Sequence, residues 1–208
     1  MQSKNLLLTH KIESLVKEAL EEKVATSFQV AVIKNNQIIF KEKFGKSYKY
    51  FDIASVTKAV FTTPVILTLA HERKIKLNST IQTYLPEFNH TAIGKIKIQD
   101  LLTQTSGLTW WKPFYLKLNK VKAIKEKQKL LLELLKKENV ASKKKCEYSD
   151  LNFILLGLLI QKIEKTSLDK VFKKRIATKN KLKNTFFSDE KRPPSLFAPT
   201  EKHSKRGV

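Results

Sequence analysis

One stretch of the chain constrains its fold most, the residues FDIASVTKAVFTTPVILTLAHE at 51–72. A short extended run turns here into an amphipathic helix, with Ser55 at the first helical turn. Lys58 follows three residues later, so its side chain shares a helix face with that of Ser55. A hydroxyl is a weak nucleophile until a base takes its proton, and the positive end of a helix favours both an alkoxide and a neutral amine. Ser55 and Lys58 are therefore candidates for a nucleophile and its base.

The Ser-x-x-Lys spacing carries little information by itself. The chain has 37 Lys and 13 Ser, and the pattern occurs five times. Chance alone would give about two occurrences, so the bare pattern has almost no specificity. Two later stretches distinguish Ser55 from the other four serines: LLTQTSGL at 101–108 and EYSDLNFILLG at 147–157.

In this order, the three stretches resemble the serine β-lactamases and penicillin-binding-protein-like hydrolases, especially the group related to class C β-lactamases and their esterase relatives. The resemblance runs from about Phe28 to the end of the chain and is closest over 51–108 and 147–160. It implies the N-terminal part of a β-lactamase/transpeptidase-like fold. It also implies an acyl-enzyme mechanism on an ester, amide or β-lactam substrate.

The same resemblance implies roles for individual residues. Ser55 matches the family's nucleophile, Lys58 its partner base, and Tyr148 the tyrosine of a Tyr-x-Asn motif, which shuttles a proton. Asp150 stands at the Asn position of that motif, where it brings a negative charge towards Lys58 and cannot donate as an amide does. Asp150 is also well placed to cap a helix starting at Leu151, so capping and site lining both remain open.

Three further features flank these residues. The Ser106-Gly107 pair is expected to be structural, with Gly107 ending a short helix. Trp110 is a candidate to line the mouth of the site or to pack in the core. Asn152 is near Asp150 in sequence, but on a helix it should point elsewhere.

The family's third motif is absent from this sequence. After Tyr148 there is no Lys-Thr-Gly or His-x-Gly triplet. In relatives, that motif lies on a strand that lines the pocket and usually supplies an oxyanion-hole N–H. Relatives also continue well beyond a stretch like APTEKHSKRGV. The resemblance therefore implies a C-terminally truncated hydrolase, and loss of an oxyanion donor predicts little or no activity.

Composition and charge exclude several other classes. The net charge is +22, but 37 of the 41 cations are Lys and 4 are Arg. Nucleic-acid surfaces favour Arg, so no specific nucleic-acid partner is expected. The four His show no metal-ligand spacing, and no metal or cofactor is expected. The sequence shows neither a signal peptide nor an apolar run long enough for a membrane span, which predicts a cytoplasmic protein. The oligomeric state is left open.

The pattern predicts an α+β chain, mainly helical, that forms a single incomplete domain over 1–208. Its expected parts are an N-terminal helix (5–23), a β-hairpin remnant of the sheet (28–44), a helical region (55–176) and a loop-rich tail (180–208). Within the helical region, the helix from Ser55 is expected to run to about Arg73, with a kink at Pro64.

Three functions remain open at this point. The first is a β-lactamase-related serine hydrolase that works through a Ser55 acyl-enzyme. The second is a non-catalytic remnant or interaction module that keeps the helical part of the fold. The third is a weak basic binder of polyanions. Covalent labelling at Ser55 separates the first function from the other two.

Overall fold

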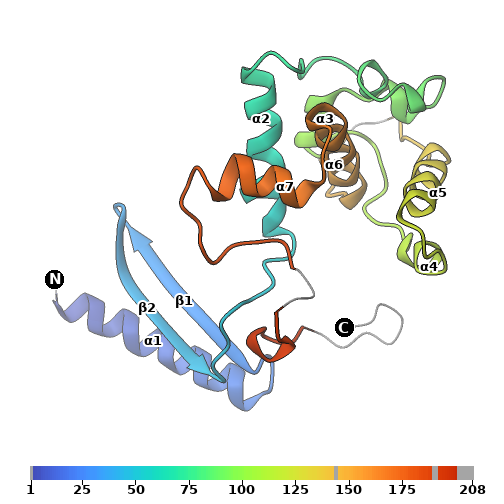
Figure 1. Cartoon of the computed structure of the whole chain (residues 1–208). Coiled ribbons are helices and arrows are strands. Elements are labelled where there is room, and N and C mark those ends of the chain that lie inside the picture. The colour runs from blue at the N-terminus through green and yellow to red at the C-terminus, as the bar shows by residue number, and fades with distance from the viewer. Residues whose placement is uncertain (1, 143–144, 189–191, 201–208) are drawn as a thin grey trace. The chain divides into compact units, whose positions relative to one another are not determined.

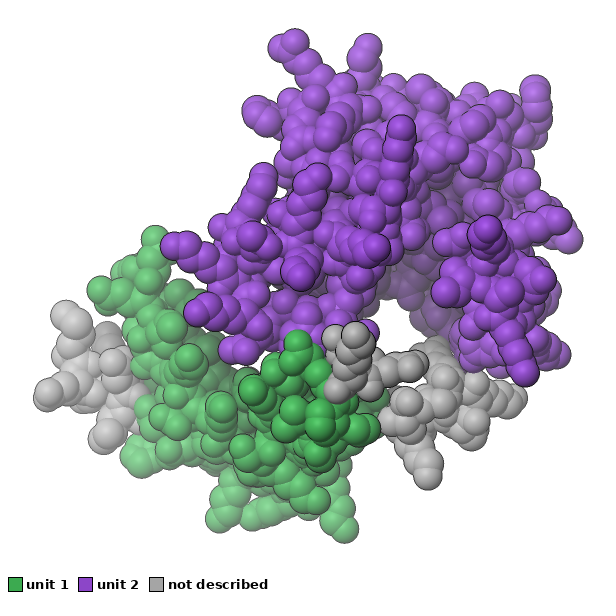
Figure 2. Space-filling model, viewed as in Figure 1, with its two compact units in different colours: residues 1–52, 189–201 green, residues 53–188, 202–208 purple. Residues whose placement is uncertain are grey.

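The structure is a computed structural model that describes residues 2–142, 145–188 and 192–200. The chain divides into two compact units (Figure 2): residues 1–52 with 189–201, and residues 53–188 with 202–208. We call them the hairpin unit and the helical unit. The elements are mainly helices with one two-stranded antiparallel sheet, which confirms the predicted α+β class. The single incomplete domain expected from the sequence stays a prediction.

The hairpin unit begins with helix α1 (Gln2–Glu21), followed by strands β1 (Ser27–Lys34) and β2 (Gln37–Gly45). The strands pair in the antiparallel sense, as predicted, and α1 runs beside them (Figure 1). The turn between them consists of Asn35 and Asn36, with φ angles of 50° and 59°. Both angles are positive, as a two-residue type I′ turn requires, and Asn tolerates them better than most residues.

Part of the tail also belongs to the hairpin unit. Tyr50 forms a parallel bridge with Phe197, and their ring centroids are 5.3 Å apart. The backbone N–H of Ala198 donates to the carbonyl of Tyr50 at 2.9 Å. The predicted loop-rich tail contains a 3-10 turn over Pro194–Leu196, and its last stretch, 201–208, lies outside the described residues.

The helical unit contains short helices that surround one long apolar helix (Figure 1). Its α-helices are α2 (Thr63–His71), α3 (Ile98–Leu102), α4 (Tyr115–Leu118), α5 (Ile124–Lys136), α6 (Asp150–Glu164) and α7 (Leu168–Phe172). Three 3-10 turns lie between α2 and α3, at Ile81–Thr83, Pro86–Phe88 and Ile93–Lys95. A π-helical turn, Lys173–Ala177, extends α7.

The helix after Ser55 departs from the predicted regular form. Residues Lys58–Thr62 form a π-helical turn, and the α-helix itself starts only at Thr63. Pro64 lies just beyond this π turn and has no N–H to donate back into it, so it interrupts the helical hydrogen bonds there, and a π turn often marks a functional site. Arg73 adopts a left-handed φ of 58° just beyond the end of α2 at His71. The predicted kink therefore appears as a wider turn before Pro64.

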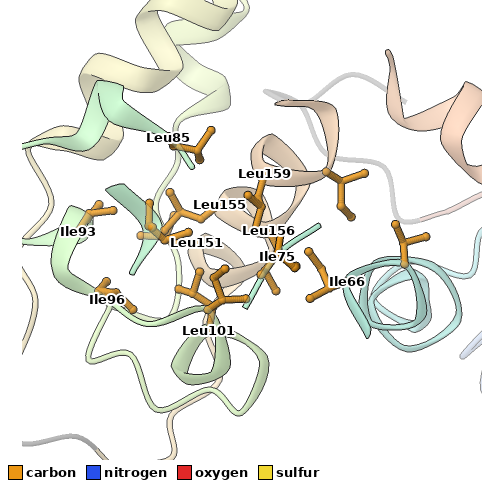
Figure 3. Close-up of a cluster of buried hydrophobic side chains, with 14 of the residues drawn as sticks. Ile66, Ile75, Leu85, Ile93, Ile96, Leu101, Leu151, Leu155, Leu156 and Leu159 are labelled. Atoms are coloured by element: carbon orange, nitrogen blue, oxygen red, sulfur yellow. The ribbon is translucent and has the colours of Figure 1, made fainter. Parts of the chain in front are cut away.

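Helix α6 forms the centre of the hydrophobic core (Figure 3). Leu151, Leu155 and Leu159 on α6 are at most 1% exposed. They pack with buried side chains of α2, α3 and the segment between these helices, among them Ile66, Ile75, Leu85, Ile93, Ile96 and Leu101. Burial of a leucine contributes roughly 1.5–3 kcal/mol, so this core fixes α6 and the residues just before it.

Gly107 does not end a helix, which corrects the prediction. Helix α3 ends at Leu102, and Gln104 already has a left-handed φ of 61°. Gly107 has a φ of 81°, and a Cβ placed there would lie 2.6 Å from the carbonyl oxygen of Ala141. The N–H of Ala141 donates to the Gly107 carbonyl at 2.8 Å. Glycine is therefore required by a close approach between two loops.

No helix in the described part of the chain combines the length and the apolar character needed to cross a membrane.

Candidate active site

Ser55 lies in a tight turn directly before the first helical residues. The N–H of Val56 donates to the carbonyl of Ile53 at 2.9 Å, and that of Lys58 donates to the carbonyl of Ser55 at 3.0 Å. Ala54 has a φ of 41°, which is rare for a residue with a side chain. Such strain costs on the order of 1–3 kcal/mol and clusters at functional sites. The turn presents the Ser55 side chain at the surface.

Four of the side chains singled out from the sequence meet at this turn. The Oγ of Ser55 is 2.9 Å from the hydroxyl of Tyr148. Lys58 Nζ donates to Ser55 Oγ at 3.1 Å and is 2.7 Å from Asp150 Oδ1. The Tyr148 hydroxyl also donates to Asp150 Oδ1, at 3.2 Å. Residues 93 apart in sequence thus form one closed hydrogen-bonded ring.

Lys58 is the most buried charge of this ring, with 18% of its side chain exposed. Burial lowers the pKa of its ammonium, but hydrogen bonds and charge attraction from Asp150 and Tyr148 outweigh it, so the net shift is upward from 10.5. The ammonium also lies 5.1 Å from the ring centroid of Tyr148 and 5.7 Å from that of Phe153. Aromatic faces attract a cation, which adds to the stability of the charged form.

The residues before α6 are held by a second loop, residues 104–110. Gln104 Oε1 accepts the backbone N–H of Ser149 at 3.0 Å. Ser149 Oγ donates to the carbonyl of Thr109 at 2.7 Å. The backbone N–H of Asp150 donates to the carbonyl of Trp110 at 2.9 Å. On the other side of Tyr148, the N–H of Glu147 donates to the carbonyl of Gln104 at 2.9 Å, so the backbone is fixed both before and after the phenol.

A buried contact locks this loop to α6. Ser106 Oγ donates to Asn152 Oδ1 at 2.6 Å, and Asn152 Nδ2 donates to Gln104 Oε1. Asn152 is fully buried, and its amide is used by the loop rather than by the Ser55 ring. The sequence prediction that Asn152 points elsewhere is confirmed, as is the structural role of Ser106.

Trp110 contributes to the site through its backbone. Its carbonyl accepts the Asp150 N–H, while its indole is 61% exposed and lies 5.9 Å from the ring of Trp111. Asp150 likewise differs from one of the two expected roles. Helix α6 starts at Asp150, with Ser149 in the capping position, and the Asp150 carboxylate bonds to Lys58 and Tyr148. It therefore lies in the first turn, where the helix dipole favours a negative charge.

Gln104 is the residue of this region whose role the sequence did not reveal. Its side chain accepts hydrogen bonds from both Ser149 and Asn152. The role depends on two segments more than 40 residues apart coming together. The local sequence carries no signal of this role, because the positive φ of Gln104 is visible only in the structure.

A cavity of about 570 Å³ opens beside the ring of polar side chains. Ser55, Lys58 and Asp150 line one part of it. The other walls are largely apolar: Leu131 on α5, Phe153, Ile154 and Leu158 on α6, and Leu168 on α7. Within the described residues, no group of three His, Cys, Asp or Glu side chains comes together to hold a metal ion. The arrangement suits chemistry carried by the hydroxyl, the phenol and the ion pair.

Comparison with known proteins decides the family. Residues 12–207 match the family described as beta-lactamase. The chain belongs to the beta-lactamase family. A putative D-alanyl-D-alanine carboxypeptidase of Salmonella agona (strain SL483) is 28% identical over 204 residues, covering 85% of this chain and 47% of that protein. The chain thus spans about half the length of the curated relatives it matches.

Solved structures show the same beta-lactamase fold. A class C beta-lactamase in complex with cefoxitin has a TM-score of 0.76 at 17% identity, over 94% of this chain and 55% of the other. A beta-lactamase/D-alanine carboxypeptidase from Pseudomonas syringae has a TM-score of 0.74 at 19% identity, over 92% and 55%. The described elements are therefore the N-terminal part of a beta-lactamase fold, and family membership makes the chain a serine-hydrolase relative.

Proposed function

We propose that Ser55 is the nucleophile of a serine hydrolase that attacks an ester or amide carbonyl and forms an acyl-enzyme. The observation that carries the proposal is the position of Ser55 Oγ between two proton-handling groups, 2.9 Å from the Tyr148 hydroxyl and 3.1 Å from Lys58 Nζ. A nucleophile within hydrogen-bond reach of a base, with that base held by a third group, is the recurring arrangement of acyl transfer.

The proposed roles follow from the geometry. Tyr148 lies where it can take the proton of Ser55 as the Oγ–C bond forms and return it to the leaving group. The Lys58 ammonium donates to Ser55 Oγ and stabilises the negative charge that develops there. The backbone N–H of Ser55 is a candidate donor to the carbonyl oxygen, as in other serine hydrolases.

The proposed substrates are small acyl compounds, with a D-alanyl peptide or a β-lactam as the classes named for the relatives. The cavity beside Ser55 has apolar walls from α5, α6 and α7 that suit an uncharged acyl group. A non-catalytic interaction module is the alternative function, and binding of polyanions through the net charge of +22 is a third.

Covalent labelling tests the nucleophile. A fluorophosphonate probe and a fluorescent penicillin are incubated with the purified chain, and the adduct is mapped by mass spectrometry. We expect the label on Ser55 and its complete loss in Ser55→Ala. Ser14→Ala is the matched control, because Ser14 is exposed on α1 and begins another Ser-x-x-Lys pattern. A folded protein that takes no label, or takes it first on another serine, contradicts the proposal and favours the non-catalytic module.

A further inference from the structure

The hydrogen-bonded ring at Ser55 has one consistent direction. Lys58, as an ammonium, can only donate, and it donates to both Ser55 Oγ and Asp150 Oδ1. A carboxylate can only accept, so the Tyr148 proton in the 3.2 Å contact points to Asp150 Oδ1. The phenol oxygen is then left to accept the proton of Ser55 across 2.9 Å. Every bond of the ring is satisfied in this direction.

The direction of these hydrogen bonds identifies which side chain can be the final acceptor of the Ser55 proton. Lys58 holds its proton firmly, because its contacts to Asp150 and Tyr148 outweigh the effect of burial and raise its pKa. An ammonium has no lone pair to receive a proton. The carboxylate of Asp150 does, and it is already in hydrogen-bond contact with the phenol that touches Ser55.

We propose that Asp150 is the terminal proton acceptor of this site, receiving the Ser55 proton through Tyr148, while Lys58 stays an ammonium and acts as an electrostatic donor. The inference rests on the proposed acyl transfer at Ser55 and goes beyond it, because it names the carboxylate that finally holds the proton passed on by Tyr148, where the sequence resemblance implied Lys58 as the base.

The transfer balances within the ring. As Ser55 Oγ bonds to the acyl carbon, its proton moves to the Tyr148 oxygen and the Tyr148 proton moves to Asp150 Oδ1. The carbonyl π electrons move to the carbonyl oxygen. When the tetrahedral intermediate collapses, the bond to the leaving group breaks, and the leaving group takes a proton from Tyr148, which recovers one from Asp150. After this step Tyr148, Asp150 and Lys58 carry the protons they had at the start, and the proton of Ser55 has departed with the leaving group.

The surroundings of Asp150 leave it free to do this. Its side chain is 38% exposed, in the first turn of α6. Lys58 and Tyr148 are the titratable side chains in contact with it among the described residues. The facing loop supplies the Trp110 carbonyl to its backbone, and the cavity walls from α5 and α7 are apolar at Leu131 and Leu168. A third ionisable group therefore does not compete for the proton in this part of the structure.

The test compares the pH dependence of Ser55 labelling in the wild type, Asp150→Asn and Asp150→Ser. The amide of Asn and the hydroxyl of Ser cannot take the proton of Tyr148. Acylation in either variant therefore requires a pH high enough to deprotonate the Lys58 ammonium, which then serves as the base. We expect labelling at pH 7 to fall by roughly a hundredfold, the lower range for loss of a general base. We also expect the pH of half-maximal labelling to rise. Glu126→Gln removes one exposed carboxylate from α5 and should leave both quantities unchanged.

The direction of the pH shift separates this role from simple positioning. If Lys58 were the base and Asp150 only positioned its side chain, removing the carboxylate would lower the pKa of Lys58. The pH of half-maximal labelling would then fall. If the pH of half-maximal labelling falls or stays the same while Ser55 is still labelled, the inference is overturned, but the proposed function is not. A wild type that takes no label at Ser55 overturns both. Tryptophan fluorescence confirms that each variant is folded, since Trp110 and Trp111 lie in the helical unit.

Discussion

The two units of this chain bury their side chains to very different degrees. The helical unit has a continuous core that runs from α2 through α6 to α7. In the described part of the hairpin unit, the hydrophobic side chains that are less than a tenth exposed are those of Val16, Phe40 and Tyr50. Ile33 and Ile38, near the turn of the hairpin, are 67% and 60% exposed. A two-stranded hairpin is marginal without such a core.

The difference explains where a precise site can be built. Ser55, Lys58, Tyr148 and Asp150 all belong to the helical unit. The packed core beneath α6 and the 104–110 loop fix the backbone that carries Tyr148 and Asp150. Catalytic groups need supporting contacts to hold their geometry, and the helical unit supplies those contacts from its own residues.

Loss of a buried ion pair should affect the helical unit most. Arg175 donates two hydrogen bonds to Glu72, at 2.8 and 2.9 Å, and one to Glu164, at 2.6 Å, and its side chain is 8% exposed. Arg175→Met leaves the Glu164 carboxylate, 6% exposed, with Lys74 as its remaining partner. Removing one partner of a buried pair costs about 3–5 kcal/mol, to be measured by urea unfolding with tryptophan fluorescence.

The hairpin unit offers the matched control for this change. Lys17 and Glu21 on α1 form an ion pair of 3.9 Å in which both side chains are exposed. Exposed pairs contribute little, so Lys17→Met should change the free energy of unfolding by less than about 0.5 kcal/mol. Equal losses in the two variants would show that the two units do not differ in this respect.

Leucine truncation should give the next largest difference. Leu155 on α6 is fully buried, and Leu155→Ala should lower the free energy of unfolding by about 2–5 kcal/mol through lost contacts and a cavity. Leu15 on α1 is 65% exposed, so Leu15→Ala should cost less than about 0.5 kcal/mol. Urea unfolding measures both. A loss above 2 kcal/mol for Leu15→Ala would mean that α1 is as well packed as α6.

The sequence predicted the parts of the fold that depend on local pattern. The apolar run after Ser149 predicted a helix there, and the pattern over 28–44 predicted the hairpin, because periodicity and turn chemistry act over a few residues. The meeting of Ser55, Lys58 and Tyr148 followed from motif order. Their catalytic roles stay proposals.

Features that depend on distant contacts were not predictable. Arg175 and Glu72 form an ion pair although they are 103 residues apart in sequence, and the sequence around neither residue predicts this pair. Gln104 has a left-handed backbone conformation, so the chain is no longer helical when it reaches Gly107. Gly107, which the sequence predicted to end a helix, instead allows the backbone of Ala141 to approach closely. The sequence left two roles open for Asp150, and only the contacts of its carboxylate with Lys58 and Tyr148 distinguish site lining from capping. Each case was decided by packing between segments.

Acid should produce the smallest of these effects, again in the helical unit. Hydrogen bonds from Arg175 and then Lys74 lower the pKa of Glu72 from 4.5 to about 2, and Arg175 also lowers the pKa of Glu164. A carboxyl whose pKa is lowered by folding stabilises the protein above its unfolded pKa and loses that contribution as the pH falls to its folded pKa. The contribution should therefore be full above about pH 4.5 and disappear towards pH 2.

The comparison of the wild type with Glu72→Gln isolates this effect from the repulsion among the other charges, which both proteins share. The difference in their free energies of unfolding, followed by tryptophan fluorescence, should be constant near neutral pH and shrink below about pH 4.5. Glu21→Gln on α1, whose ion pair is exposed, is the control, and it should change the free energy of unfolding at neutral pH by less than about 0.5 kcal/mol. A difference that grows as the pH falls would mean that Glu72 destabilises the folded helical unit, and that the Arg175 cluster is not what holds α2 to the segment after α7.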